Sequence, residues 1–342
     1  MLLAARLRAQ LLSGVRPASA LEATRQLLAV QAQDPRGARL AIRARSTAKS
    51  AICVDRVLNE RELVITWVNR GTLHLVAAED EPLLHLLTTP QLRTGCERRL
   101  RQEGVSDAAA RRGVRAIAAA LESGPHTREE LRVVLEQGRV PTAGQALVHV
   151  LFAATLDGLI VRGPMRGAHQ QFVLAADWLG PRPAVDIESA SAELARRYLQ
   201  GHGPATAPDL AKWAGITLGA ARGALATIAR QLNELPGGLL DLRGRPRPPR
   251  IPRAALLGAF DSLLLGWSDR ELIVGANDAR IVGGGMFRPI ALIAGRVAGT
   301  WRLERGRVAL DLWDDAPPPP PAALAALARE AAAVEAYLRT AG

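Results

Sequence analysis

The feature that most constrains the fold is a repeated order of helix, turn, helix and β-hairpin. Its clearest copy runs from Gly124 to Val173. Thr127, followed by two glutamates, is typical of a helix start, because its hydroxyl can accept hydrogen bonds from free backbone N–H groups. Thr142 can cap a second helix with apolar residues at helical spacing, and two short apolar runs then flank a turn rich in Gly, Arg and His. Asp157-Gly158 ends that second helix, so the order is typical of a winged helix.

Two weaker copies of the pattern flank the first one. The third copy begins near Thr206 and predicts helices over 209–214 and 218–232, the latter a candidate recognition helix. Its first wing strand is expected at 239–242. The N-terminal copy has a helical pattern at its start and a hairpin around Asn69-Arg70-Gly71. Its expected elements are helices over 19–30 and 54–58 and strands over 63–67 and 72–76.

The last part of the chain has a different pattern. Residues 243–253 (RGRPRPPRIPR) are too rich in proline for a helix and predict an extended connector with five arginines, which could follow phosphates or simply be solvated. Beyond it, short apolar runs between glycine-containing turns predict an antiparallel sheet or small barrel, before an alanine-rich helix over 322–338. The runs are Glu271–Val274, Ile290–Ile293, Val297–Leu303 and Val308–Leu312.

Together these patterns predict an α+β fold of tandem winged-helix units and a C-terminal antiparallel β-barrel-like region. A chain of 342 residues is long enough for two to four compact units. We expect the first winged-helix unit, with the two glutamines discussed below, over 1–105 and the second over 106–182. The third is expected over 183–250, and the β-barrel-like region with the final helix over 251–342.

Composition adds little to the prediction of a partner. A net charge of +11 and a pI near 11.1 favour a polyanion such as nucleic acid, although a membrane surface or an acidic protein also fits. Lys49 and Lys212 are the only lysines, and such arginine bias is also typical of a GC-rich genome. Cys53 and Cys96 lack metal-ligand spacing, and residues 1–12 lack a long apolar segment, so we expect a cytoplasmic protein without zinc or disulfides.

Gln31-Ala32-Gln33 is the candidate chemical site. Pro35 disfavours helical angles at Asp34 and predicts a helix end near Gln33, where a turned or extended backbone lets both amides converge. Paired amides donate and accept hydrogen bonds and so can hold a water molecule. That is adequate chemistry only where the leaving group is already activated, as in an alkylated purine. Spacing alone favours a structural role for these glutamines.

A resemblance to a known family favours a catalytic role for the two glutamines over a structural one. The stretch LLAVQAQDPRGARLAIRAR (27–45) is similar to the signature of the winged-helix crosslink DNA glycosylases, the AlkZ- and YcaQ-like group, whose motif is Gln, an apolar residue, then Gln or Asp. Gln31, Ala32 and Gln33 match its Gln-x-Gln branch. The resemblance covers most of the chain, since it continues through TWVNRGTLHLV (66–76), DLAKWAG (209–215), FDSLLLGWSDR (260–270) and FRPIALIAGRVAGTW (287–301).

The resemblance implies three winged helices around a concave DNA-binding surface, a β-barrel, and hydrolysis of the N-glycosidic bond of alkylated bases, including interstrand crosslinks. It implies catalytic roles for Gln31 and Gln33 and no metal or organic cofactor. Because Gln33 stands where the carboxylate branch has Asp, crosslink unhooking is not carried over. Simple alkylpurines and a single natural-product adduct remain equally open as substrates.

We therefore expect a monofunctional DNA glycosylase that acts as a monomer on damaged double-stranded DNA, without membrane attachment. Gln31 and Gln33 would position water, and basic side chains on the wings would hold phosphates. The candidate DNA contacts are Arg70, His74, Arg162, Arg166, His169, Lys212, Arg222, Met286 and Arg288. Two alternatives stay open: a non-catalytic winged-helix DNA-binding regulator, and a module whose winged helices bind protein.

Overall fold

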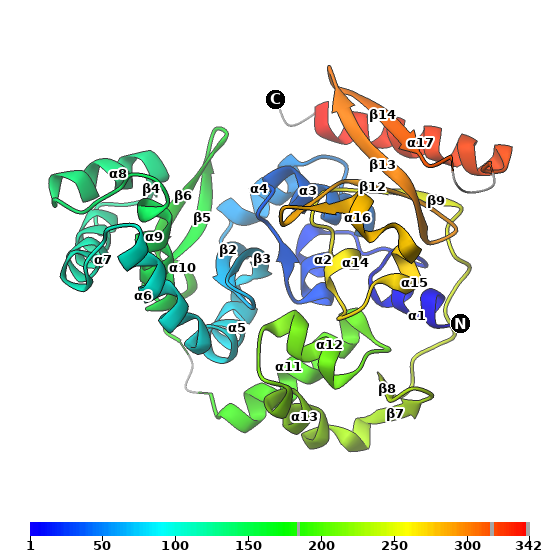
Figure 1. The fold of residues 1–342 in the computed structure, drawn as a ribbon, viewed down its shortest axis with the longest axis horizontal. Helices are drawn as coiled ribbons and strands as arrows, with labels where there is room; N and C mark the ends of the chain where they lie inside the picture. The colour runs from blue at the N-terminus through cyan, green and yellow to red at the C-terminus, as the bar shows by residue number, and fades with distance from the viewer. Residues whose placement is uncertain (183–184, 315–317, 340–342) are drawn as a thin grey trace. The chain divides into compact units, whose positions relative to one another are not determined.

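The computed structural model describes residues 1–182, 185–314 and 318–339, and the chain forms two compact units within it (Figure 1). The terminal unit contains Met1–Val54, Ser191–Trp213 and Thr217–Gly342, and the middle unit contains Asp55–Ala190 and Ala214–Ile216. Residues 183, 184, 315–317 and 340–342, which fall in the third and fourth predicted parts, lie outside the description. The division into four parts stays a prediction. Among the described residues no helix has the length and apolar character needed to cross a membrane.

An antiparallel sheet organises the middle unit, with its strands in the order β3-β2-β5-β6-β4. The predicted hairpin around Asn69-Arg70-Gly71 is confirmed. Asn69 (φ 57°) and Gly71 (φ 78°) adopt the left-handed backbone that this tight turn requires. The strands are β2 (Leu63–Val68), β3 (Thr72–Ala77), β4 (His126–Thr127), β5 (Ile160–Arg166) and β6 (His169–Leu174).

Helices pack around this sheet, and α8 begins where the sequence predicts. The Thr127 hydroxyl accepts from the Glu130 N–H at 3.3 Å, while the Glu130 carboxylate accepts from the Thr127 N–H at 2.7 Å. The cap predicted at Thr142 is wrong: Gly144, at φ 58°, keeps the chain non-helical, so α9 begins only at Ala146. The helices are α5 (Glu81–Thr88), α6 (Arg93–Gln102), α7 (Asp107–Leu121), α8 (Arg128–Gln137), α9 (Ala146–Leu156) and α10 (Ala175–Leu179).

The terminal unit begins with short helices and includes the elements expected after residue 206. Two helices follow one another there as predicted, although α13 ends at Thr227. The strand expected at 239–242 is present, but it is the second strand of a hairpin rather than the first, because the end of the expected helix forms the strand Leu232–Leu235 that pairs with it. The elements are α1 (Leu2–Ala9), α2 (Ala20–Leu27), β1 (Val30–Gln31), α3 (Pro35–Arg45), α11 (Ile187–His202), α12 (Ala207–Ala214), α13 (Leu218–Thr227), β7 (Leu232–Leu235) and β8 (Leu239–Leu242). Helix α4 (Ile52–Asn59) begins in the terminal unit and lies mostly in the middle one.

The C-terminal region of the terminal unit contains an open sheet in the order β14-β13-β12-β9, so the expected closure into a barrel is wrong. Its four strands do not close on themselves; instead α17 lies across the sheet and buries apolar side chains such as Leu327 and Val334 against it (Figure 1). The elements are β9 (Ala254–Leu257), β12 (Ile290–Ile293), β13 (Arg296–Glu304), β14 (Arg307–Leu312) and α17 (Pro321–Arg339).

The strand expected at Glu271–Val274 is the short helix α15 (Glu271–Val274), because the N–H groups of Ile273 and Val274 bond back to the Arg270 carbonyl. A run of four residues with three apolar side chains does not by itself distinguish a strand from a helical turn. The remaining elements are α14 (Ser262–Leu265), α16 (Asp278–Ile281), β10 (Val282–Gly283), β11 (Met286–Phe287) and short 3₁₀ turns at Ala78–Asp80, Pro90–Leu92, Ala229–Gln231 and Gly275–Asn277.

Three tryptophans are buried in the terminal unit. Trp213 and Trp267 surround His202, whose ring also stacks on Tyr198 with centroids 4.8 Å apart. Trp301 lies beneath α17 and donates from Nε1 to the Leu257 carbonyl at 2.9 Å. The first group of rings packs α11 and α12 together with the chain after α14, and Trp301 belongs to the core between the C-terminal sheet and α17.

Candidate active site

Gln31 and Gln33 lie in an extended segment between two helices. Helix α2 ends at Leu27, and Leu28 (φ 64°) turns the chain into β1. The prediction that Pro35 ends a helix near Gln33 is wrong: Pro35 occupies the first turn of α3, where its missing N–H is not needed. The Asp34 carboxylate caps that helix by accepting from the Arg36 N–H at 3.1 Å.

The two amides converge, as the sequence predicts. Gln31 Nε2 donates to Gln33 Oε1 at 2.7 Å. Residues two apart on an extended chain lie on the same side, which explains the contact despite the misplaced helix end. Gln31 is only 6% exposed, whereas Gln33 is exposed to solvent. The buried amide therefore holds the exposed one in place, and the pair offers a polar, uncharged surface to a molecule arriving from solvent.

Helix α3, which follows this segment, is fixed by a fully buried ion pair. Arg45 donates from Nη1 and Nη2 to the two carboxylate oxygens of Asp261 at 2.8 and 2.6 Å, and both side chains are 0% exposed. Arg45 also donates to Gln10 Oε1 at 3.2 Å. At Gly37 a Cβ atom would lie 2.3 Å from the Ala259 carbonyl oxygen. The helix backbone therefore packs directly on the chain before Asp261.

A second set of contacts joins α3 to the C-terminal sheet and helix. Arg43 Nη2 donates to the Glu330 carboxylate at 2.7 Å and to the Leu256 carbonyl at 3.3 Å. The Tyr337 hydroxyl donates to the Arg39 carbonyl at 3.0 Å. With Leu28, Ala29, Val30 and Ala32 all buried, the amide pair stands on a rigid support. Such support is needed to hold reacting groups in a fixed geometry.

His74 lies on β3 of the middle unit, opposite Thr66 on β2, and is 3% exposed. Its Nδ1 lies 2.9 Å from the Thr72 carbonyl oxygen. Burial and, after it, the charge of Arg70 lower the pKa of His74 to about 3. The imidazole is therefore neutral near pH 7 and offers hydrogen bonding rather than positive charge. Arg70 itself is half-buried in the β2–β3 turn.

Arg162 lies on β5 between two aromatic rings, 4.6 Å from the Trp67 ring centre and 4.9 Å from that of Phe172. Burial, followed by the charge of Arg128, lowers the pKa of the Arg162 guanidinium to about 10, so it stays charged near pH 7. Its buried Nε has no hydrogen-bond partner among the described residues. The arginine is thus a fixed cation in the sheet rather than a mobile side chain.

Arg166 and His169 face each other at the tip of the β5–β6 hairpin, and both are exposed. Arg166 Nη2 donates to Glu130 Oε1 at 2.6 Å, which links the hairpin to the start of α8. The sequence therefore placed these two candidates together correctly on one wing-like hairpin. The Glu130 partner was not expected.

The remaining candidates lie in the terminal unit and are exposed. Lys212 on α12 donates from Nζ to the Ser268 carbonyl at 2.9 Å, and Arg222 projects from α13. Met286, which is 62% exposed, and Arg288 lie at the β10–β11 hairpin. The exposed thioether stands beside the turn at Gly284 and Gly285, whose positive φ angles (56° and 80°) close this hairpin.

Sequence reasoning missed Arg45 and Asp261 as residues that support the site. Both lie within stretches that carry the family resemblance, which was the available signal, but their separation by 216 positions hides the pairing. Among the described residues, no group of three or more His, Cys, Asp or Glu side chains is arranged to hold a metal ion.

Comparisons with known proteins agree on one family. The model of the AlkZ-like DNA glycosylases matches residues 24–337. The chain is similar to an interstrand DNA cross-link repair glycosylase of Streptomyces sahachiroi, with 27% identity over 333 residues, 87% of this chain and 86% of the relative. The solved structure of the Streptomyces sahachiroi DNA glycosylase AlkZ superposes with a TM-score of 0.78 at 25% identity, covering 98% of this chain and 95% of that one.

Proposed function

Because this chain belongs to the AlkZ-like DNA glycosylase family, we propose that it is a monofunctional glycosylase that releases alkylated purines from double-stranded DNA. The observation that carries the proposal is the contact between Gln31 and Gln33 within that family match. The alternative of a non-catalytic DNA-binding regulator does not explain why the chain matches a family of DNA glycosylases.

Gln31 and Gln33 would bind the attacking water without removing its proton. An amide is not a base at neutral pH, but its oxygen accepts and its NH₂ group donates hydrogen bonds. The water oxygen forms a bond to C1′ of the deoxyribose while the C1′–N bond breaks and its electron pair returns to the base. The proton leaves to solvent. The amide oxygens face the positive charge that develops on the sugar and stabilise it.

Uncharged groups suffice where the leaving base is already cationic. A purine alkylated at N7 or N3 departs as a neutral molecule, so it needs little acid assistance, and positioning of water becomes the main task. We extend the substrate class to bulky and interstrand-crosslinked adducts because the similar Streptomyces sahachiroi protein is named as an interstrand cross-link repair glycosylase. Because Gln33 stands where the carboxylate branch has Asp, the preferred lesion has to be determined by experiment.

The surrounding units would hold the duplex. We propose that α7, β4, α8, α9, β5 and β6 form a winged helix whose hairpin presents Arg166 and His169 to phosphates. In the terminal unit, α13 would be the helix that faces DNA, because Arg222 and much of its surface are exposed. Met286 and Arg288 at the β10–β11 hairpin would contact a groove. The half-buried Arg70 and Arg162 and the buried His74 would act from within the sheet.

Base release from alkylated and crosslinked duplex tests the catalytic assignment. We expect Gln31→Ala and Gln33→Ala each to lower single-turnover release by about 10²- to 10³-fold, the usual effect of removing one group that stabilises a developing charge. Gln137→Ala is the matched control, since Gln137 is an exposed amide at the end of α8. Equal release by the wild type and the double variant would remove these glutamines from the mechanism.

The same assay separates the substrate classes. Duplexes carrying N3-alkylated, N7-alkylated and crosslinked purines are compared under identical conditions. Release from the alkylated duplexes together with intact crosslinks would restrict the proposal to simple adducts. Release from none of them, by a folded protein that binds duplex DNA, would contradict the proposed substrate class.

A further inference from the structure

A cavity of about 630 Å³ in the terminal unit has an unusually cationic lining, which includes neither Gln31 nor Gln33. It lies among the end of α1 and the loop after it, Gln26 of α2, Gln200 of α11 and the proline-rich segment after β8. Four arginines line it and no acidic residue does. We call it the arginine cavity. Its arginines are Arg8, Arg243, Arg245 and Arg247.

The proline-rich segment explains why these arginines share one cavity. Proline at 246, 248 and 249 excludes a helix and favours extended backbone. On an extended chain every second residue lies on the same side. Arg245 and Arg247 follow that spacing and both reach the arginine cavity, and Arg243 reaches it from the turn at Gly244 (φ 75°) that precedes the extended chain. Arg250 is out of step with Arg245 and Arg247, is exposed and does not line the cavity.

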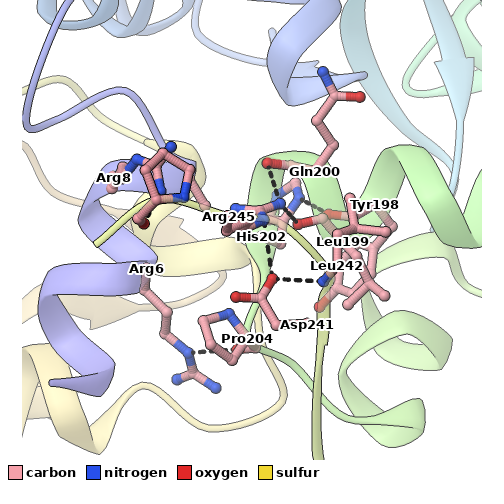
Figure 2. A network of polar contacts seen from close by, with 12 residues as sticks. Arg6, Arg8, Tyr198, Leu199, Gln200, His202, Pro204, Asp241, Leu242 and Arg245 are labelled. Atoms are coloured by element: carbon pink, nitrogen blue, oxygen red, sulfur yellow. Dashed lines mark hydrogen bonds and ion pairs between the residues drawn. The ribbon is translucent and has the colours of Figure 1, made fainter. Parts of the chain in front are cut away.

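The backbone holds several of these arginines in place. Arg8 Nη1 donates to the Pro246 carbonyl at 2.5 Å, and Arg243 Nε donates to the Leu232 carbonyl at 2.9 Å. Figure 2 shows the Arg245 guanidinium at the main-chain carbonyl oxygens of Leu199 and Gln200, the latter at 2.8 Å. These bonds fix the guanidinium groups through neutral partners and leave their positive charge in place.

Of these four arginines, only Arg245 has a carboxylate partner among the described residues, since Asp241 lies 3.0 Å away. Asp241 does not line the arginine cavity but lines the neighbouring one, which Arg8, Arg245 and Arg247 also reach. Burial lowers the pKa of Arg245, Asp241 opposes that change and Arg8 adds to it. Arg8 and Arg245 therefore repel each other across the arginine cavity. Arg247 has neither a hydrogen bond nor an ion pair with any described residue. An anion in the cavity would relieve this repulsion.

A buried hydroxyl provides a second, independent observation. Ser13 lines the arginine cavity and is 6% exposed, yet its Oγ has no hydrogen-bond partner among the described residues. Buried polar groups in native proteins are nearly always paired, so an unpaired one calls for an unseen partner. A hydroxyl beside four guanidinium groups can donate to an anionic oxygen.

We propose that the arginine cavity binds a phosphodiester group of the DNA backbone, at a point separate from the Gln31–Gln33 site. The proposal rests on the proposed function for its choice of DNA as the source of phosphate. Gln26 precedes Gln31 by five residues, so their Cα atoms are no more than about 18 Å apart. A strand advances about 3.4 Å per nucleotide. The bound phosphate therefore belongs to the duplex within several nucleotides of the lesion.

The salt dependence of binding to undamaged duplex tests this proposal without using catalysis. Each phosphate contact contributes about 0.9 to the slope of log K against log salt. We expect Arg247→Gln to reduce that slope by about 0.9, while Arg250→Gln, with the same loss of charge from the same segment, leaves it unchanged. Ser13→Ala keeps the charge and is expected to weaken binding about fivefold with the slope preserved, as for the loss of one hydrogen bond.

The outcomes separate this proposal from the proposed function. Duplex binding by the wild type with an equal slope in Arg247→Gln would overturn it, as would equal changes in Arg247→Gln and Arg250→Gln. Tight binding of inorganic pyrophosphate that Arg247→Gln abolishes, with duplex binding untouched, would assign the cavity to a free anion and overturn the DNA source. Base release by the wild type is measured separately. If the wild type releases no base but Arg247→Gln still reduces the salt slope, the result contradicts only the proposed glycosylase activity.

Discussion

Loss of the charge on Asp261 is expected to destabilise the terminal unit strongly. Asp261→Asn keeps the shape of the side chain but leaves the Arg45 guanidinium, which is 0% exposed, without a counter-ion. Breaking a buried ion pair by removing one partner costs about 3–5 kcal/mol, because the remaining charge stays desolvated. The cap of α14 is expected to survive, since asparagine keeps an oxygen that can accept from the Leu263 N–H, as the Asp261 carboxylate does at 2.9 Å, so the loss is mainly that of the charge.

Thermal unfolding measures this effect. For a unit of this size about 1 kcal/mol corresponds to 2–4 °C, so we expect the Tm to fall by about 6–20 °C. Asp157→Asn is the matched control, because Asp157 pairs with Arg93 at 2.6 Å but the two side chains are 42% and 50% exposed. An exposed pair contributes less than about 1 kcal/mol. Similar losses in the two variants would contradict the role that we assign to burial.

A second comparison distinguishes an unpaired charge from lost packing. Replacing both partners, as Arg45→Met with Asp261→Leu, removes the charges together and is expected to leave a more stable protein than Asp261→Asn alone. If the double variant unfolds at a lower temperature than the single one, the cost lies in shape rather than in charge, and our reasoning about this pair is refuted.

Two further predictions concern packing and pH. Gly37→Ala is expected to lower the free energy of unfolding by about 1–3 kcal/mol, because the new Cβ meets the Ala259 carbonyl. Gly95→Ala, in an open position on α6, is the control and is expected to be neutral or stabilising. Denaturant titration of both variants measures the difference, and equal effects would count against the prediction. Burial lowers the pKa of His202 to about 3. The His202 imidazole therefore stays neutral in the folded protein, while in the unfolded chain it gains a proton below about pH 6.5. The free energy of unfolding consequently falls by about 1.4 kcal/mol per pH unit as the pH drops from about 6.5 to about 3. His202→Asn should flatten the decline between pH 7 and pH 5, and an unchanged slope would contradict it.

Local signals predicted the elements that depend on neighbouring residues. The capping box at Thr127 and the turn at Asn69-Arg70-Gly71 are encoded within a few positions, and both are found. Pro35 was assigned to the wrong side of a helix boundary, since proline is equally compatible with the residue after one helix and the first turn of the next. Gln31 and Gln33 still converge, because convergence requires only an extended chain between them.

Features that depend on distant residues were beyond reach. The pairing of Arg45 with Asp261 joins segments 216 positions apart, and nothing in either segment identifies the other. The open C-terminal sheet has the same strand pattern as a barrel, and what distinguishes them is that α17 covers the sheet. From the sequence, the segment that contains Arg247 is predicted only as an extended connector. The cavity that it lines could not be predicted, because Arg8 and Ser13 are far from Arg247 in the sequence.

The ties that hold α3 also set an order of events during synthesis. This helix begins at residue 35, yet Asp261, Glu330 and Tyr337 leave the ribosome only much later. The middle unit, whose core lies between these segments in the sequence, emerges complete beforehand and can fold while the terminal unit waits. A translation product that stops before residue 330 lacks the ties to α17, so the segment with Gln31 and Gln33 gains its full support only after Glu330 and Tyr337 have been made.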